Sequence, residues 1–227
     1  MRIVLAHSDS RPFEAERFGA AWRAAGFDPE ELVPLTPLTP AGEREEVLDA
    51  ASGVLLSGGP DVEPWRYGSA PDPRAEVRPD PPRDALDIAL LAGAEERGLA
   101  VLAICYGLQV LNVYHGGTLV QDLTRAGFPG HSIGEPKDAI AHDVHLVDDA
   151  GPLLGLPRAF GANSRHHQAV DRLAAPLRTI AIAPDGLIEA VTLEEPRLFV
   201  LGVQWHPENM RQGEHLDIFR RFRAACR

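Results

Sequence analysis

The stretch Ala100-Val-Leu-Ala-Ile-Cys105-Tyr-Gly107-Leu-Gln109 decides how this chain folds. An apolar run ends at a single cysteine, and a glycine and a helical pattern of apolar residues follow it. This order predicts a buried strand, a sharp turn that carries Cys105, and a helix. The turn places the sulfur at a helix N-terminus, where free N–H groups and the helix dipole favour a thiolate, the reactive form of cysteine. The segment therefore indicates a nucleophile, although alone it is also typical of an inert core cysteine.

A second apolar run, Leu198-Phe-Val-Leu-Gly-Val-Gln-Trp205, leads directly into His206-Pro-Glu208. It predicts a buried strand that ends at a histidine, with a carboxylate two residues further on. A histidine base held by a carboxylate is the usual partner of a cysteine nucleophile. We therefore expect Cys105, His206 and Glu208 to form a catalytic triad, and an ordinary turn after the strand is the alternative.

The rest of the chain alternates strands with helices and then changes character. Strands are predicted over 2–6, 31–35 and 53–56, and helices over 13–25, 42–50 and 83–98; further strands over 139–147, 177–183 and 187–193 precede a closing helix over 213–225. The alternation predicts an α/β fold with a mainly parallel sheet and helices on both faces. The turn 184–186 predicts a hairpin, so the C-terminal half adds antiparallel strands. We expect one domain over 1–227.

Composition excludes several functions. The net charge of −11 argues against binding to nucleic acid or to an acidic membrane surface. Lys137 is the only lysine, so no Walker-type phosphate loop is present, and no G-x-G-x-x-G follows a strand. We expect no cofactor and a small-molecule substrate. No signal-peptide or membrane-spanning pattern is found, and Cys105 and Cys226 lie too far apart for a disulfide framework, which favours a cytoplasmic protein.

Two further segments carry candidate site residues. Gly58-Gly59 follows a predicted strand, and the N–H of Gly59 together with that of Tyr106 is expected to form an oxyanion hole, with a plain tight turn as the alternative. The polar run Asn163-Ser-Arg-His-His-Gln168 is expected to line a substrate pocket. His166-His167 and His142-x-x-His145 each resemble half of a metal site. We expect no metal, since no cysteine or carboxylate completes either pair at metal-site spacing.

Taken together, these segments resemble the class I glutamine amidotransferase superfamily and, more narrowly, the γ-glutamyl-γ-aminobutyrate hydrolase (peptidase C26-like) family. The resemblance covers residues 53–209 and rests on Leu55-Leu-Ser-Gly-Gly-Pro-Asp-Val-Glu-Pro64, Ile104-Cys-Tyr-Gly-Leu-Gln-Val-Leu-Asn112, Gly116-Gly-Thr-Leu-Val-Gln-Asp122, Asn163-Ser-Arg-His-His-Gln-Ala-Val170, Ala183-Pro-Asp-Gly-Leu-Ile-Glu-Ala190 and Gly202-Val-Gln-Trp-His-Pro-Glu208. It implies a flavodoxin-like fold, the same Cys-His-Glu triad, and hydrolysis of a γ-glutamyl amide through a γ-glutamyl thioester. It also suggests a homodimer.

The resemblance adds expected substrate contacts at Gly58, Gln109, Ser164 and His167. Three arginines, Arg66, Arg125 and Arg165, are each suited to a substrate carboxylate, and the sequence does not choose among them.

Two positions depart from the family pattern. Tyr106 stands where this branch usually has arginine, and Asp87 stands where it usually has glutamate. The two departures do not affect the triad residues. They do leave undetermined which amine is attached to the γ-glutamyl group. A γ-glutamyl amide hydrolase is therefore the first hypothesis. A glutaminase subunit that supplies ammonia to a separate synthetase is the second, and a non-catalytic binding protein is the third.

Overall fold

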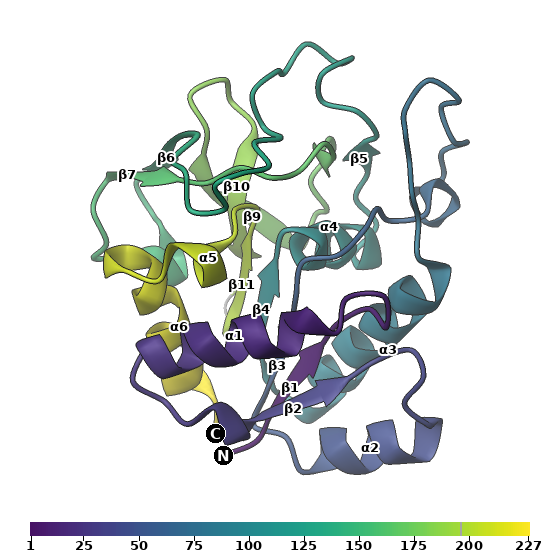
Figure 1. Ribbon diagram of the computed structural model, residues 1–227, viewed down its shortest axis with the longest axis vertical. Coiled ribbons are helices and arrows are strands. Elements are labelled where there is room, and N and C mark those ends of the chain that lie inside the picture. Colours follow the sequence, from purple (N-terminus) through teal and green to yellow (C-terminus); the bar gives the residue numbers. More distant parts are fainter. Residues whose placement is uncertain (196) are drawn as a thin grey trace.

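The computed structural model describes residues 1–195 and 197–227 and contains a nine-stranded mixed sheet (Figure 1). Its strand order is β2-β1-β3-β4-β11-β10-β9-β6-β7. The strands are β1 Ile3–Ala6, β2 Leu32–Leu35, β3 Gly53–Leu56, β4 Ala100–Ile104, β6 His142–Leu146, β7 Ala159–Ala162, β9 Leu177–Ile182, β10 Ile188–Leu193 and β11 Val200–Val203. Two short strands, β5 Leu119–Val120 and β8 Ala169–Val170, pair separately.

The first five strands of this order are parallel and form the flavodoxin-like part that the sequence predicts. Strand β1 shows why it forms: all four residues are apolar and buried, as expected of a strand covered on both faces. Ile3 and Leu5 pack into the core on one side of the sheet, and Val4 and Ala6 pack into the core on the other. The buried run therefore requires helices on both faces.

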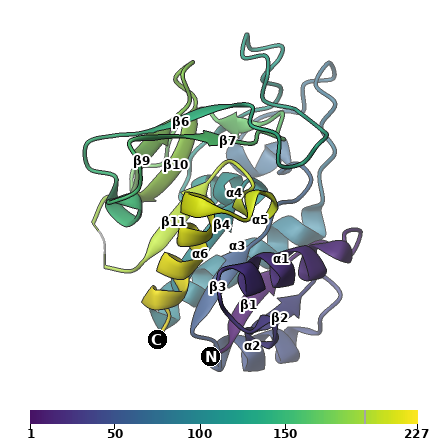
Figure 2. The ribbon, with the colours of Figure 1, turned by 60° about the vertical axis from the view of Figure 1, so that its left-hand side comes forward.

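Helices cover both faces of the parallel part (Figures 1 and 2). Their bounds are α1 Phe13–Ala24, α2 Ala41–Asp49, α3 Pro81–Arg97, α4 Tyr106–Tyr114, α5 Pro207–Met210 and α6 Gly213–Ala225. Trp22 of α1 packs with Phe219 and Phe222 of α6 on one face, whereas α2, α3 and α4 share the core on the other. Helix α3 has clear sequence signals at both ends, since the Asp80 side chain caps its N-terminus and Gly98 adopts a left-handed conformation at its C-terminus.

The remaining four strands are antiparallel and extend the sheet beyond β11, as the hairpin signal predicts. The strand predicted over 139–147 is shorter, and its partner β7 was not predicted, because β7 is only four residues long and contains a glycine. The strand predicted to run to Trp205 ends at Val203, and the backbone turns there, so His206 directly precedes α5. Within the described residues, every helix is too short or too polar to cross a membrane.

Candidate active site

Cys105 lies on a strained turn between β4 and α4. Its φ of 53° and ψ of −104° are unusual for a residue with a side chain, and such strain is typical of a nucleophile elbow. Gly107 makes this turn possible: a Cβ at that position would lie 2.7 Å from the carbonyl oxygen of Leu56 on β3. The elbow therefore presents the sulfur at the carboxyl end of the parallel strands, which is the usual location of sites in such sheets.

The structure brings His206 and Glu208 to the same end of the sheet as Cys105. His206 Nδ1 lies 2.7 Å from Glu208 Oε1, and Cys105 is near enough to the ring to raise the pKa of the histidine. Asn163 holds the histidine backbone: its Oδ1 accepts from the His206 N–H at 2.8 Å, and its Nδ2 donates to the His206 carbonyl at 3.0 Å. The three residues predicted to form a triad are thus neighbours.

Charge on both sides of the ring sets the protonation of His206. Burial alone would lower the pKa of this histidine, but the negative charges of Glu208 and Cys105 outweigh burial and raise the pKa to about 10. His206 is therefore an imidazolium at neutral pH. A protonated ring beside the sulfur suits a thiolate nucleophile and supplies a proton for a leaving amine.

Gly58 and Gly59 follow β3 and pack closely against the site. A Cβ at Gly58 would lie 2.8 Å from His206 Cε1, and one at Gly59 would lie 2.8 Å from the ring of Tyr106. Gly59, Tyr106 and Cys105 line the same cavity, and the N–H of Tyr106 in the first turn of α4 has no acceptor within its own helix. The arrangement suits the predicted oxyanion hole. Gly58 instead makes room for the histidine ring and does not line the cavity, so we do not retain it as a substrate contact.

The side chain of Tyr106 does not face a substrate. Its ring is fully buried under Gly59, and its hydroxyl donates to Asp84 Oδ1 at 2.5 Å. Arg83, also fully buried, lies over the ring at 5.1 Å and pairs with Asp87 through two hydrogen bonds of 2.7 and 3.0 Å. Burial raises the pKa of Tyr106 well above its ordinary value, so the hydroxyl stays protonated. Both departures from the family pattern therefore belong to one buried network beneath the elbow.

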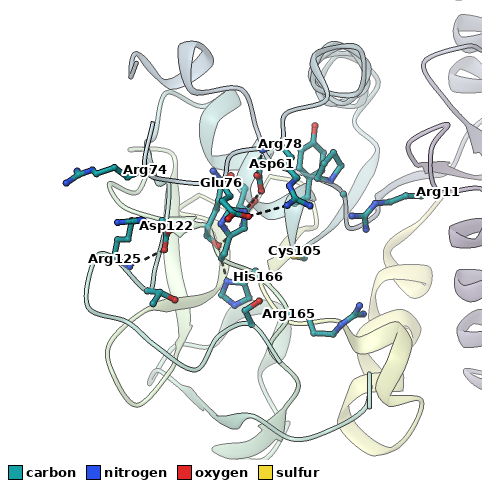
Figure 3. A pocket seen from close by; sticks show the side chains of 18 residues that line it. Arg11, Asp61, Arg74, Glu76, Arg78, Cys105, Asp122, Arg125, Arg165 and His166 are labelled. Atoms are coloured by element: carbon teal, nitrogen blue, oxygen red, sulfur yellow. Dashed lines mark hydrogen bonds and ion pairs between the residues drawn. The ribbon is translucent and has the colours of Figure 1, made fainter. Parts of the chain in front are cut away.

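A cavity of about 550 Å³ opens in front of Cys105 (Figure 3). Five of its lining residues are arginines: Arg11, Arg74, Arg78, Arg125 and Arg165. Asp61, Glu76 and Asp122 are its acidic members. Arg11, Arg74, Arg78 and Arg125 each lie within 4.0 Å of a carboxylate of the chain, and among the described residues Arg165 has no such pair.

The structure distinguishes the three arginines that the sequence offered as partners of a substrate carboxylate. Arg66 does not line the cavity and pairs with Asp84 at 3.0 Å. Arg125 lines it and lies 3.4 Å from Asp122. Arg165 also lines it, and no ion pair within the described part of the chain includes it; its buried Nε has no hydrogen-bond acceptor there either. Arg165 is therefore the guanidinium best placed to bind a carboxylate.

The other predicted contacts divide in the same way. Gln109 and His167 line the cavity: Gln109 Nε2 donates to the Gln168 carbonyl at 2.9 Å, and His167 Nε2 lies 2.8 Å from Asp61, whose hydrogen bond raises the pKa of that histidine. Ser164 does not line the cavity. Its hydroxyl contacts His131 and His166 in a buried cluster beside the cavity, which His166 also lines, so the expectation that Ser164 touches substrate is not retained.

Sequence reasoning missed one residue beside the nucleophile. Gln204 Nε2 lies 3.5 Å from Cys105 Sγ and donates to it. In the sequence, Gln204 is a polar residue near the end of an apolar run. Such a residue is also common where a strand simply ends, so it did not indicate a contact with the nucleophile.

Comparisons with known proteins identify the family and the fold. The family model for peptidase C26 matches residues 23–208. The glutamine amidotransferase-like protein YvdE of Lactococcus lactis is 36% identical over 81% of this chain and 77% of its own length. The γ-glutamyl-γ-aminobutyrate hydrolase PuuD of Escherichia coli is 36% identical over 80% of this chain and 74% of its own length. A glutamine amidotransferase structure from Methylobacillus flagellatus shares the fold, with a TM-score of 0.60, 18% identity, and coverage of 95% of this chain and 72% of that one.

Proposed function

The chain belongs to the peptidase C26 family, and from that premise we propose that it hydrolyses a γ-glutamyl amide through a γ-glutamyl thioester on Cys105. The observation that carries the proposal is that Cys105, on a strained turn, lines an arginine-rich cavity and lies beside a histidine that Glu208 holds at 2.7 Å. The hydrolase name of the E. coli relative and the amidotransferase-like name of the L. lactis relative both support chemistry at a γ-glutamyl carbonyl.

In the first half of the proposed reaction, the sulfur of Cys105 attacks the γ-carbonyl carbon and the carbonyl π electrons move to oxygen. The N–H groups of Gly59 and Tyr106 stabilise this oxyanion, an interaction whose loss typically costs about 2.7–4 kcal/mol of barrier. The tetrahedral intermediate then collapses and the carbon–nitrogen bond breaks. The amine takes a proton from His206 and leaves, and the enzyme retains a thioester.

In the second half, water replaces the amine. His206, now neutral, takes a proton from the water as the oxygen attacks the thioester. Collapse of the second intermediate breaks the carbon–sulfur bond and releases glutamate, and the protonated ring and the thiolate are restored. Glu208 holds the imidazole throughout, and Arg165 binds a carboxylate of the substrate.

The test is glutamate release from a panel of γ-glutamyl amines and glutamine, with Cys105→Ala as the matched control. We expect release by the wild-type protein from at least one amide and none by the variant. The preferred amine then identifies the second half of the substrate. Release that persists in Cys105→Ala contradicts the proposal.

A glutaminase subunit is the second candidate, because the L. lactis relative carries an amidotransferase-like name. It predicts activity with glutamine alone, and only when an ATP-using partner is added. Hydrolysis of another γ-glutamyl amine by the isolated protein argues against it.

A further inference from the structure

A second group of histidines and a carboxylate lies next to the site, and the proposed reaction does not use it. We call it the His–Glu cluster: His131, His142, His166 and Glu189. His131 lies in the segment between β5 and β6, His142 begins β6, His166 lies between β7 and β8, and Glu189 is on β10. Glu189 is fully buried, and His131 and His166 are 4% and 5% exposed. The cluster thus joins four segments of the chain inside the protein.

The outward-facing nitrogen of each ring is already bonded to an acceptor. His166 Nδ1 donates to the Gln168 carbonyl at 2.9 Å, and His142 Nδ1 donates to the Asp143 carbonyl at 3.2 Å. His131 Nε2 donates to the Asp185 carboxylate at 2.8 Å. Since carbonyl and carboxylate oxygens only accept, these nitrogens carry the ring protons. In the neutral rings, the inner nitrogens are therefore bare lone pairs.

These inner nitrogens face another acceptor. His142 Nε2 lies 3.4 Å and His131 Nδ1 lies 3.9 Å from Glu189 Oε1. Among the described residues, neither oxygen of Glu189 has a hydrogen-bond partner, and His142 Nε2 has none. Burying acceptor atoms without donors is costly. A cation or additional protons at the centre of the cluster would remove that cost.

Ser164 does not supply the missing protons. Its hydroxyl lies 3.2 Å from His131 Nδ1, 3.1 Å from His166 Nε2 and 3.0 Å from the His131 carbonyl. One hydroxyl proton serves only one of these three acceptors. Lone pairs therefore outnumber protons in the cluster.

We propose that the His–Glu cluster binds one divalent transition-metal ion of the zinc class. His131 Nδ1, His166 Nε2 and a Glu189 oxygen are the ligands, and His142 Nε2 lies beside them, 3.4 Å from Glu189 Oε1. One ligand atom from each of these three lies within 4.8 Å of the others, and ligand atoms around a bound tetrahedral zinc are about 3.3 Å apart, so binding draws them together by up to about 1.5 Å. Imidazole nitrogens with one carboxylate suit zinc, and outer nitrogens bonded to carbonyl or carboxylate oxygens are the usual second shell.

The ligands are buried and the proposed reaction does not use the ion, so we assign it a structural role. It fixes one wall of the cavity, because two lining residues adjoin its ligands in sequence: Ser132 follows His131, and Arg165 precedes His166. The two segments already pair, since the His166 N–H donates to the His131 carbonyl at 2.8 Å. Metal binding therefore strengthens the wall that carries Arg165.

The test measures metal binding directly, in tag-free Cys105→Ala protein stripped with a chelator. The substitution removes the sulfur, so that Cys105 and His206 cannot jointly bind the ion. On titration with Co²⁺, the ligand-field absorption should reach its maximum at one equivalent of metal, with the intensity of a tetrahedral site. Added Zn²⁺ should displace the Co²⁺ and abolish this absorption. In the same Cys105→Ala background, the further substitution Glu189→Gln should weaken metal binding about 100-fold or more. His145→Gln is the matched control, because His145 lies on the same strand with an exposed side chain.

Two results overturn the proposal, and neither depends on hydrolytic activity. One is the absence of stoichiometric Co²⁺ or Zn²⁺ binding by the folded Cys105→Ala protein. The other is unchanged affinity in both the Glu189→Gln and His166→Gln variants, with folding checked by circular dichroism. A Zn²⁺-dependent rise in melting temperature that the His145→Gln control retains and Glu189→Gln loses supports the site independently.

Discussion

Two groups of histidine and carboxylate lie close together in this protein and behave in opposite ways. In the first, Glu208 accepts from His206 and, with Cys105, raises the pKa of that ring to about 10. In the second, Glu189 receives no hydrogen bond from the described residues, and burial lowers the pKa of His166 to about 3. The same residue types therefore give a charged pair in one place and a set of bare lone pairs in the other.

Geometry explains the difference. Glu208 is two residues from His206 and lies 2.7 Å from its Nδ1, so a proton fits between the two atoms. In the His–Glu cluster the outer ring nitrogens already hold their protons against Gln168, Asp143 and Asp185. The first arrangement is suited to proton transfer and the second to a cation. Four substitutions test this contrast.

His206→Ala removes the charged ring of the first group and has the largest expected effect. Without a base and proton donor, kcat/KM for γ-glutamyl amide hydrolysis should fall on the order of 10⁶-fold, as for histidine loss in other triads. His145→Gln is the control and should leave the rate unchanged, since its side chain is exposed on β6. A loss of less than about tenfold would remove His206 from the mechanism.

Glu208→Gln keeps the shape of the first group but removes the negative charge that holds His206 protonated. The rate should fall about 10⁴-fold. In the wild type, activity that needs the imidazolium declines as pH rises through the His206 pKa of about 10. Loss of the Glu208 charge lowers this pKa, so in Glu208→Gln the decline begins at a lower pH. The measurement is kcat/KM against pH, and an alkaline limb at the same pH in both proteins contradicts the assignment.

Arg165→Gln tests the boundary between the two groups, because Arg165 lines the cavity and adjoins His166 in sequence. Loss of a charge-assisted carboxylate contact of about 1.5–3 kcal/mol should raise KM roughly 10- to 100-fold with little change in kcat. Arg66→Gln, which alters an arginine outside the cavity, should leave KM unchanged. Equal KM effects from both variants would show that general charge, and not position, matters.

Tyr106→Phe has the smallest expected effect on activity. Its hydroxyl lies beneath the elbow on Asp84 and does not face the cavity, so kcat/KM should stay within about threefold. Stability should fall by about 1–3 kcal/mol, because the buried Asp84 loses a donor. Urea unfolding measures the loss. A large change in substrate preference at unchanged stability would instead place the tyrosine at the substrate.

The parallel part of the fold and the elements of the triad follow from local sequence. A short apolar run predicts a buried strand, and a cysteine or histidine at its end is carried to the same edge of a parallel sheet as its neighbours. Cys105 and His206 could therefore be paired although about a hundred residues separate them. Strand β7 and the end of β11 were not predicted correctly, because a four-residue strand and a bend near a polar residue give weak periodicity.

By itself, the sequence determined the α/β class, the elbow at Cys105 and the expectation that His206 and Glu208 serve it. Only the tertiary structure decided which of the three candidate arginines line the cavity and where the Tyr106 ring lies. It also decided that Glu189 lies beside three histidines. The physical reason is whether a regular element aligns the residues, not how far apart they lie in the chain. Strand-end residues are aligned by the regular sheet, whereas the members of the His–Glu cluster come from segments whose mutual approach depends on antiparallel pairing and loop packing.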